Sequence, residues 1–224
     1  MITIPSDGKA FIVGNGPSTT AERLDQLIGK FTFGMNRIAL MFPKTEWRPT
    51  CYIGTTSAVW DDRHKADILA AVDAAESAYC WDAWSINKKG IVYCPCSEIN
   101  HVDYNDVTDE IWSDDPTVRL SKFGVTAFPA MQVAAYMGFK TICLIGCDGG
   151  YSRPQNGKDA SHFDAGYRPF DAYANYDYEE LNNALHTAHA IAERNCVRLG
   201  VKIYNLSPTS TVKAHEFMPF EDAL

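Results

Sequence analysis

Short apolar runs alternate along the chain with longer stretches of helical periodicity. The apolar runs are bounded by Gly, Asn or Pro, have the length of buried strands, and lie at residues 10–13, 31–36, 50–54, 90–94, 140–148 and 201–206. The helical stretches lie at residues 19–29, 61–76, 126–137 and 178–199. Strands that alternate with helices are typical of a parallel sheet with both faces covered. The pattern therefore predicts an α/β fold with a mainly parallel sheet and helices on both faces, in one domain over residues 1–224.

Local signals mark the ends of two predicted helices. Thr19 and Glu22 have the spacing of a capping box at the start of the first helical stretch. Pro17 suits the first helical position, where its missing N–H would have had no partner. Gly200 follows the last helical stretch and is predicted to end that helix before the final strand.

Two segments, residues 95–121 and 149–177, show no regular periodicity. The second is longer than an ordinary connection, and such loops are usually either functional or disordered. Its aromatic and basic residues are Tyr151, Arg153, Lys158, His162, Phe163, Tyr167, Arg168, Phe170, Tyr173 and Tyr176. Disordered segments are poor in aromatic residues, so this loop is predicted to be an ordered lid or pocket wall.

Polar residues follow several of the predicted strands. In open parallel sheets ligands bind beyond the carboxyl ends of the strands, near the point where the strand order reverses. The residues at these ends are Gly14-Asn15-Gly16-Pro17-Ser18, Asn36-Arg37, Thr55-Thr56-Ser57 and Asp148. We therefore expect a small-molecule site at this edge of the sheet.

The first of these turns resembles part of a dinucleotide fingerprint. Gly14 and Gly16 allow a tight turn and a close approach of ligand to backbone, and the helix start that follows offers N–H groups to a phosphate. However, Thr19 replaces the third glycine, and Asn36 stands where an acidic residue would bind the adenosine ribose. NAD and FAD are thus not supported. A purely structural role for the turn remains an alternative.

Candidate chemistry beyond this turn is concentrated in His162 and Asp148. His162 lies in a polar loop and titrates in the range that suits a general acid or base. Asp148 has the chemistry to bind a ribose hydroxyl, a metal ion or a backbone N–H. His186 and His189 lie on the last predicted helix and are interpreted as surface or packing residues.

Composition narrows the classes of function. A formal net charge of -8 and a pI near 5.2 argue against a protein that binds a nucleic-acid backbone. No apolar window reaches the length of a membrane span and no signal peptide is visible, which indicates a cytoplasmic protein. The seven cysteines indicate reduced thiols, and Cys94-Pro95-Cys96 lacks the second unit that a structural zinc site needs.

Three parts of the chain resemble a known family when read together. They are Gly14-Asn15-Gly16-Pro17-Ser18, Asn36, and the block GVTAFPAMQVAAYMGFKTICLIGCDGGY at residues 124–151. They resemble the bacterial sialyltransferases that build lipooligosaccharide, in a superfamily with flagellin-modification accessory proteins and the pterin pyrophosphokinase-like domain. The resemblance implies a Rossmann-like fold, a CMP-activated sugar donor, a glycan or small-molecule acceptor, and transfer with no required cofactor or metal.

The resemblance also implies roles for individual residues. Asn15, Gly16 and Ser18 would contact the CMP portion, and Asn36 would help to orient the donor. The full predicted nucleotide-binding set is Gly14, Asn15, Gly16, Pro17, Ser18, Asn36, Arg37, Thr126 and Asp148. Tyr151 would hydrogen-bond the leaving phosphate, while Arg153 and Lys158 would stabilise its developing charge.

The general base departs from the family pattern. The triplet Ser161-His162-Phe163 is preserved, but the position that matches the family's base holds Tyr167. Lys122 also replaces an arginine before the helix at residue 126. His162, Tyr167 and Tyr151 are therefore the catalytic candidates.

Two alternatives to glycosyl transfer stay open. The first is a pyrophosphokinase of the 6-hydroxymethylpterin type, which would use ATP and Mg²⁺, with Asp148 and either Asp159 or Asp164 as metal ligands. The second is a noncatalytic protein that keeps the nucleotide pocket. The transferred sugar, the acceptor and any homo-oligomer are left open by the sequence.

Overall fold

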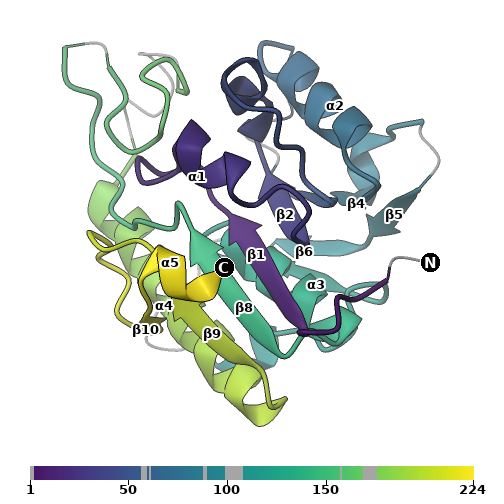
Figure 1. Cartoon of the computed structure of the whole chain (residues 1–224). Helices are drawn as coiled ribbons and strands as arrows, with labels where there is room; N and C mark the ends of the chain where they lie inside the picture. Colours follow the sequence, from purple (N-terminus) through teal and green to yellow (C-terminus); the bar gives the residue numbers. More distant parts are fainter. Residues whose placement is uncertain are drawn as a thin grey trace.

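The computed structural model describes residues 3–56, 60, 62–87, 90–98, 108–156, 158–168 and 176–224, with only the backbone described at residues 97 and 98. Within these residues the main sheet has eight strands in the order β10-β9-β8-β1-β2-β3-β4-β5 (Figure 1). Their bounds are β1 Lys9–Val13, β2 Thr32–Met35, β3 Cys51–Gly54, β4 Ser77–Trp81, β5 Ile91–Cys94, β8 Thr141–Ile145, β9 Lys202–Asn205 and β10 Glu216–Phe217. A small second sheet pairs β6 (Cys96–Glu98) with β7 (Leu120–Lys122). All of these strand pairs are parallel.

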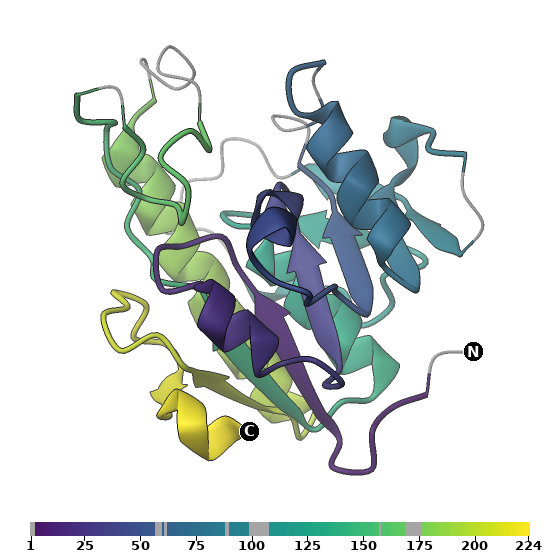
Figure 2. The same cartoon turned by 45° about the horizontal axis from the view of Figure 1, so that its top comes forward.

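Helices cover both faces of the main sheet. They are α1 Ala21–Asp25, α2 Lys65–Ala74, α3 Ala127–Met137, α4 Tyr178–Arg198 and α5 Phe220–Ala223, with short 3₁₀ turns at Ile38–Lys44, Asp82–Trp84 and Asp109–Ile111. In Figure 2, α1 and α2 lie in front of the strands and α3 lies behind them. Among the described residues no helix combines the length and apolar character that a membrane span requires. The predicted α/β, Rossmann-like arrangement is confirmed.

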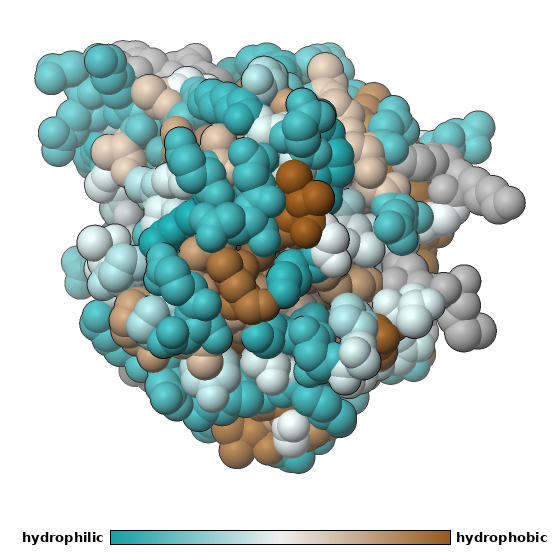
Figure 3. Space-filling model, in the orientation of Figure 1, coloured by the Kyte–Doolittle hydropathy of each residue, from teal (hydrophilic) through white to brown (hydrophobic). Residues whose placement is uncertain are grey.

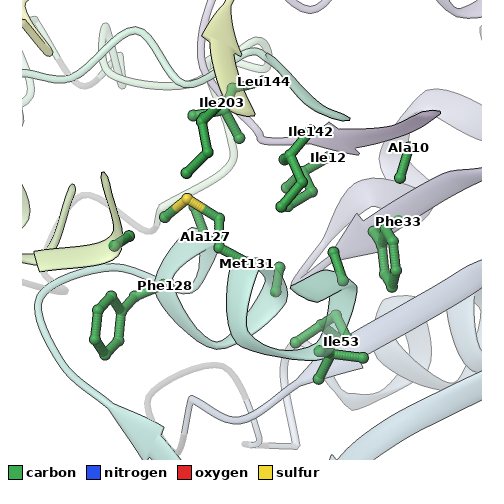
Figure 4. Packing of buried hydrophobic residues seen from close by; sticks show 14 of the residues in the cluster. Ala10, Ile12, Phe33, Ile53, Ala127, Phe128, Met131, Ile142, Leu144 and Ile203 are labelled. Atoms are coloured by element: carbon green, nitrogen blue, oxygen red, sulfur yellow. The ribbon is translucent and has the colours of Figure 1, made fainter. Parts of the chain in front are cut away.

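Alternation along the strands produces the two hydrophobic layers. In β1, Ala10 and Ile12 face the core beneath α3 and α4, whereas Phe11 and Val13 face the core beneath α1, α2 and α5. Figure 4 shows Met131 of α3 among the strand residues Ile12, Ile142, Leu144 and Ile203. Because β1 and β8 are buried on both faces, they read in the sequence as continuous apolar runs.

Every strand predicted from an apolar run is present, but β4, β6, β7 and β10 have no counterpart among the predicted strands. The β4 strand begins at Ser77, soon after α2 ends at Ala74, with no Gly or Pro between them. The predicted helix at residues 61–76 is therefore longer at both ends than the observed α2, and it includes the residues between α2 and β4. Gly200 does end α4 as predicted, with φ +69° and the backbone bonds from Gly200 N to Val197 O and from Val201 N to Cys196 O.

The first helix differs from its prediction. It starts at Ala21 rather than Thr19, and its cap is Thr20, whose Oγ1 accepts from Arg23 N at 3.4 Å. Thr19 is buried and its hydroxyl instead donates to Gly14 O at 2.9 Å. Pro17 lies in the preceding turn, exposed and outside the helix. The capping-box and first-position predictions are thus wrong, because tertiary contact with the first turn takes the Thr19 hydroxyl.

The strand order reverses between β1 and β8. From β1 the chain adds β2 to β5 on one side, and from β8 it adds β9 and β10 on the other. The connections diverge there, which leaves a crevice at the carboxyl ends of the two strands. The aromatic loop begins just after β8, and among its described residues only the Gln155–Lys158 bridge is regular. Phe170 and Tyr173 lie outside the described residues.

Candidate active site

A pocket occupies the crevice where the strand order reverses. Its volume is about 570 Å³, part of it open to solvent, and it is lined by residues 14–16, 35–36, 125–127, 146–151, 161–162, 185 and 189. These residues come from the ends of β1, β2 and β8, the start of α3, the aromatic loop and α4. The structure therefore brings together much of what the sequence placed at this edge.

Two turns cross closely at the base of the pocket. Gly14 N donates to Ile145 O at 2.7 Å, and Gly16 N donates to Gly146 O at 2.9 Å. A Cβ on Gly14 would lie 2.5 Å from Gly146 O, and one on Gly16 would lie 2.7 Å from the same atom. The glycines are needed here because two backbone turns pack against each other, which is a different reason from the close approach of a ligand that we expected.

The helix start does not form the predicted phosphate cradle. The α1 helix has five residues and begins after the turn. Ser18 N already donates to Asp148 Oδ2 at 3.1 Å, and Ser18 Oγ lies 2.8 Å from Ser207 Oγ. Neither Pro17 nor Ser18 is among the residues that line the pocket. The Ser18 N–H that was predicted to bind a phosphate therefore already donates to the Asp148 carboxylate.

Two residues that line the pocket, Asn15 and Asp148, each have a buried oxygen without a hydrogen-bond partner among the described residues. Asn15 Nδ2 donates to Met35 O at 3.1 Å, which fixes the amide and leaves Asn15 Oδ1 unpaired. Asp148 uses Oδ2 for Ser18 N and leaves its buried Oδ1 unpaired. A buried acceptor without a donor costs about 1–3 kcal/mol. These oxygens therefore favour a ligand that brings N–H or O–H groups.

A hydroxyl and amide cluster forms another wall. Asn36 Nδ2 donates to Thr126 Oγ1 at 3.1 Å, and Thr56 Oγ1 lies 2.9 Å from the same Thr126 oxygen. Asn36 is in the left-handed region, with φ +49°, and its carbonyl accepts from Tyr52 Oη at 3.1 Å. Asn tolerates this conformation better than most residues. The ends of β2 and β3 thus meet the start of α3 as the sequence predicted, while Ser57 lies outside the described residues.

His162 reaches the pocket with one ring nitrogen already held. Its Nδ1 lies 2.8 Å from Asp159 Oδ2, and the same carboxylate accepts from Arg168 Nε at 2.7 Å. An ionised Asp159 requires the His162 proton on Nδ1, which leaves Nε2 as an acceptor. Burial alone would raise the pKa of Asp159, but hydrogen bonds from His162 and Arg168 hold that pKa well below its usual range. Burial lowers the pKa of His162, so the neutral imidazole that a base requires is favoured.

Tyr167 supports His162 rather than lining the pocket. The two rings are stacked with centroids 3.9 Å apart and an interplanar angle of 5°. Tyr167 is buried, and its hydroxyl accepts from Arg37 N at 3.3 Å. Tyr151 does line the pocket, where its backbone is fixed by Asn182 through bonds of 2.6 and 3.0 Å.

The predicted cations lie away from the pocket wall. Arg37 forms an ion pair with Asp67 at 2.8 Å and packs over the Tyr167 ring at 5.4 Å. Arg153 and Lys158 are exposed. Their loop corresponds to the hydrophilic upper-left surface in Figure 3. Lys122 lies over the Trp81 ring at 3.4 Å. The lining that the structure describes contains no lysine or arginine.

His189 lines the pocket although the sequence did not place it in the site. His189 of α4 is buried, lines the pocket and places Nδ1 2.9 Å from His215 Nε2. The sequence left open whether His189 is a surface or a packing residue, and the structure buries it. The sequence gives no sign that this face of α4 meets a pocket, or that a histidine 26 residues later completes a pair.

The fold is similar to those of solved bacterial glycosyltransferases. The sialyltransferase CstII from Campylobacter jejuni, solved with a substrate analogue, cytidine-5'-monophosphate, has a TM-score of 0.51 and 17% identity, covering 95% of this chain and 85% of that one. The α-2,3-sialyltransferase Cst-I from the same organism has a TM-score of 0.54 and 14% identity, covering 96% and 82%. The MAf glycosyltransferase from Magnetospirillum magneticum AMB-1 has a TM-score of 0.58 and 14% identity, covering 96% of this chain and 34% of that one. Neither a protein-family model nor a curated protein matches the sequence. The chain therefore has a sialyltransferase-like α/β fold.

Proposed function

We propose that this chain transfers a sugar from a CMP-linked donor to a hydroxyl of a glycan or small-molecule acceptor. The observation that carries the proposal is the set of residues that line the pocket, which includes Asn15 and Asp148, each with an unpaired oxygen, and a histidine held by a carboxylate. Cytosine carries an exocyclic amino group and ribose carries hydroxyls, so a cytidine nucleotide supplies the donors that these oxygens lack. The CstII neighbour was solved with cytidine-5'-monophosphate, which supports the same choice.

The transfer needs one base and a way to accommodate the leaving phosphate. His162 Nε2 takes the proton of the acceptor hydroxyl as that oxygen bonds to the anomeric carbon, and CMP leaves with the electrons of the broken bond. Asp159 stabilises the imidazolium that forms, in the manner of a triad carboxylate. Tyr151 is the proposed hydrogen-bond donor to the phosphate. The aromatic loop limits the access of water, which would otherwise hydrolyse the donor.

The pyrophosphokinase alternative has less support. It assigns Asp148 and either Asp159 or Asp164 to a metal ion. Both oxygens of Asp159 accept bonds from Arg168, and Asp164 accepts from Gly166 N and pairs with Lys44 at 3.6 Å. Across the described ranges, no group of three or more His, Cys, Asp or Glu side chains is placed to hold a metal ion. The geometry of the pocket fits both a transferase and a noncatalytic nucleotide-binding protein. Measurements of transferase activity distinguish the two.

Ligand titration tests the nucleotide assignment. We expect CMP and CDP, but not UDP, GDP or ATP, to raise the melting temperature without Mg²⁺. Asn15→Ala should weaken CMP binding by about fivefold, since it removes one hydrogen bond of roughly 1 kcal/mol. Asn195→Ala is the matched control, because that buried Asn is bonded to Ile191 and Arg198 away from the pocket. A shift with ATP that appears only with Mg²⁺ would overturn the assignment.

Kinetics separate the two candidate bases. His162→Asn should lower kcat for CMP release from CMP-sialic acid by about 100-fold while CMP still binds. Tyr167→Phe should keep kcat within a few fold, because it retains the ring that stacks on His162 and removes only a hydroxyl bonded to Arg37 N. Release of CMP is followed directly by chromatography. A larger loss for Tyr167→Phe than for His162→Asn would move the base to Tyr167.

A further inference from the structure

Arg37, which follows β2, joins α2 to the aromatic loop. Its Nε and Nη2 both lie 2.8 Å from Asp67 Oδ2 on α2. Its Nη1 donates to the carbonyl oxygen of Gly166 at 3.5 Å and to the carbonyl oxygen of Tyr167. Only 11% of the Arg37 side chain is exposed, against 27% of the Asp67 side chain. The guanidinium therefore connects two separate parts of the chain in a place largely removed from water.

Arg37 also contacts the side chain of Tyr167. Arg37 N donates to Tyr167 Oη at 3.3 Å, and the guanidinium lies 5.4 Å from the centroid of the Tyr167 ring. One residue thus contacts the backbone, the ring and the hydroxyl of Tyr167. The Tyr167 ring in turn stacks on the imidazole of His162, with centroids 3.9 Å apart. A change at Arg37 therefore reaches His162 through the Tyr167 ring.

Charge gives Arg37 a second effect on His162. The titratable and charged groups around His162 are Asp159, Arg168, Tyr151 and Tyr167 of the loop, Arg37 with its partner Asp67, and Asp148 and His189 in the same pocket. Burial lowers the pKa of His162, the bond to Asp159 opposes this, and the positive charges of Arg168 and Arg37 lower the pKa further. Arg37 therefore favours the neutral imidazole, the form that a general base requires.

We propose that Arg37 is a positioning residue for the transfer: it fixes the Tyr167 ring against His162 and so holds the imidazole in one orientation. This role rests on the proposed function, because it takes His162 as the base. It differs from the contact with the nucleotide that the sequence predicted for Arg37. A base that is already oriented needs no rearrangement when the acceptor binds, and a small displacement of such a group is costly in rate.

NMR tests the positioning without any assumption about the reaction. A ring stacked on an imidazole moves the imidazole proton resonances upfield, so we expect this shift for His162 in the unmodified protein. In Arg37→Met the upfield shift should shrink, because the Tyr167 ring loses the contacts that fix it. Arg48→Met is the matched control, since the Arg48 guanidinium also binds two backbone carbonyls and lies over an aromatic ring, but within its own segment. An unchanged His162 shift in folded Arg37→Met would overturn the proposal.

Kinetics give the second readout. Arg37→Met should lower kcat for transfer to an acceptor by about tenfold, with CMP binding unchanged. It should also move the acidic limb of the pH profile to higher pH, because loss of the positive charge raises the pKa of His162. Asp67→Asn keeps the guanidinium but removes its carboxylate partner, so it should lower kcat in the same direction by a smaller factor.

The outcomes of these measurements separate the positioning role from the proposed function. An unaltered kcat in folded Arg37→Met would reject the role, and Asp67→Asn decides in the same way if Arg37→Met does not fold. If the unmodified protein neither binds CMP nor transfers sugar, the proposed function fails. The His162 resonances still show in that case whether Arg37 holds the Tyr167 ring in place.

Discussion

Gly146→Ala should lower the free energy of unfolding by about 3–5 kcal/mol and abolish CMP binding. Gly146 has φ +67°, and a Cβ there would overlap Thr19 Oγ1 and lie 2.6 Å from Gly14 O. The substitution therefore adds steric overlap between the turns after β1 and β8 to the strain of a left-handed residue. Urea unfolding and CMP titration measure the two losses.

Gly200→Ala separates these two contributions. Gly200 has φ +69°, almost the same conformation, but no atom of the described residues lies within 4 Å of the place that a Cβ would take. We expect it to cost only the strain, about 1–2 kcal/mol, with CMP binding intact. If Gly146→Ala and Gly200→Ala lowered the free energy of unfolding equally, the steric overlap between the two turns would add nothing to the cost of Gly146→Ala.

Arg168→Met should lower the free energy of unfolding by about 3–5 kcal/mol. Its guanidinium binds both oxygens of Asp159, at 2.7 and 2.8 Å, and the Asp159 side chain is fully buried. The substitution leaves a buried carboxylate without its main partner. Because Asp159 also holds His162, we expect kcat to fall as well.

Arg194→Met is the matched control for this ion pair. Arg194 also makes a bidentate pair, with Asp109 at 2.6 Å, but the two side chains are 55% and 46% exposed. Such a pair contributes at most about 1 kcal/mol. If Arg168→Met lowered the free energy of unfolding no more than Arg194→Met, the predicted stabilisation by the buried Arg168–Asp159 pair would be contradicted.

The pH dependence of the Asp159 contribution has a definite sign. Its pKa is lowered in the folded protein, so the stabilisation is present above the unfolded value of about 3.9 and is lost as pH falls below it. The advantage of the unmodified protein over Asp159→Asn should therefore shrink as the pH falls below about 4. Urea unfolding at a series of acidic pH values measures this, and a constant difference would contradict it.

The sequence predicts which backbone segments meet better than it predicts which side chains face the pocket. Strand ends can be read from apolar runs, so the expected placing of Asn15, Asn36 and Asp148 at one edge is correct, whereas the place of Thr126 at the start of α3 was implied only by the family resemblance. Arg37 shares that edge, but its guanidinium turns to Asp67, 30 residues later. No local pattern predicts such a partner.

The aromatic loop also shows that the sequence predicts the residues near the site better than it predicts their contacts. His162 is identified by its place in a polar loop and by the family resemblance. Only the folded chain shows that Asp159 and Arg168 fix the imidazole, and that Arg153 points to the Tyr178 ring instead of the pocket. The pattern predicts a surface or packing role for His189, because nothing nearby in the sequence indicates His215. Residues whose roles depend on long-range partners are the ones that pattern alone misses.

The crossing of the turns at the base of the pocket also bears on when the pocket can form. Ser18 and Asp148, which join these turns, are 130 residues apart in sequence. During synthesis, β1 has only β2 as its pairing partner on one side until β8 has emerged, and its other edge stays open. Contacts of such long separation also slow folding, because a large loop must close before they form. Nucleotide binding should therefore arise late in folding, and a ligand that binds the pocket would favour the completed sheet over its open-edged precursor.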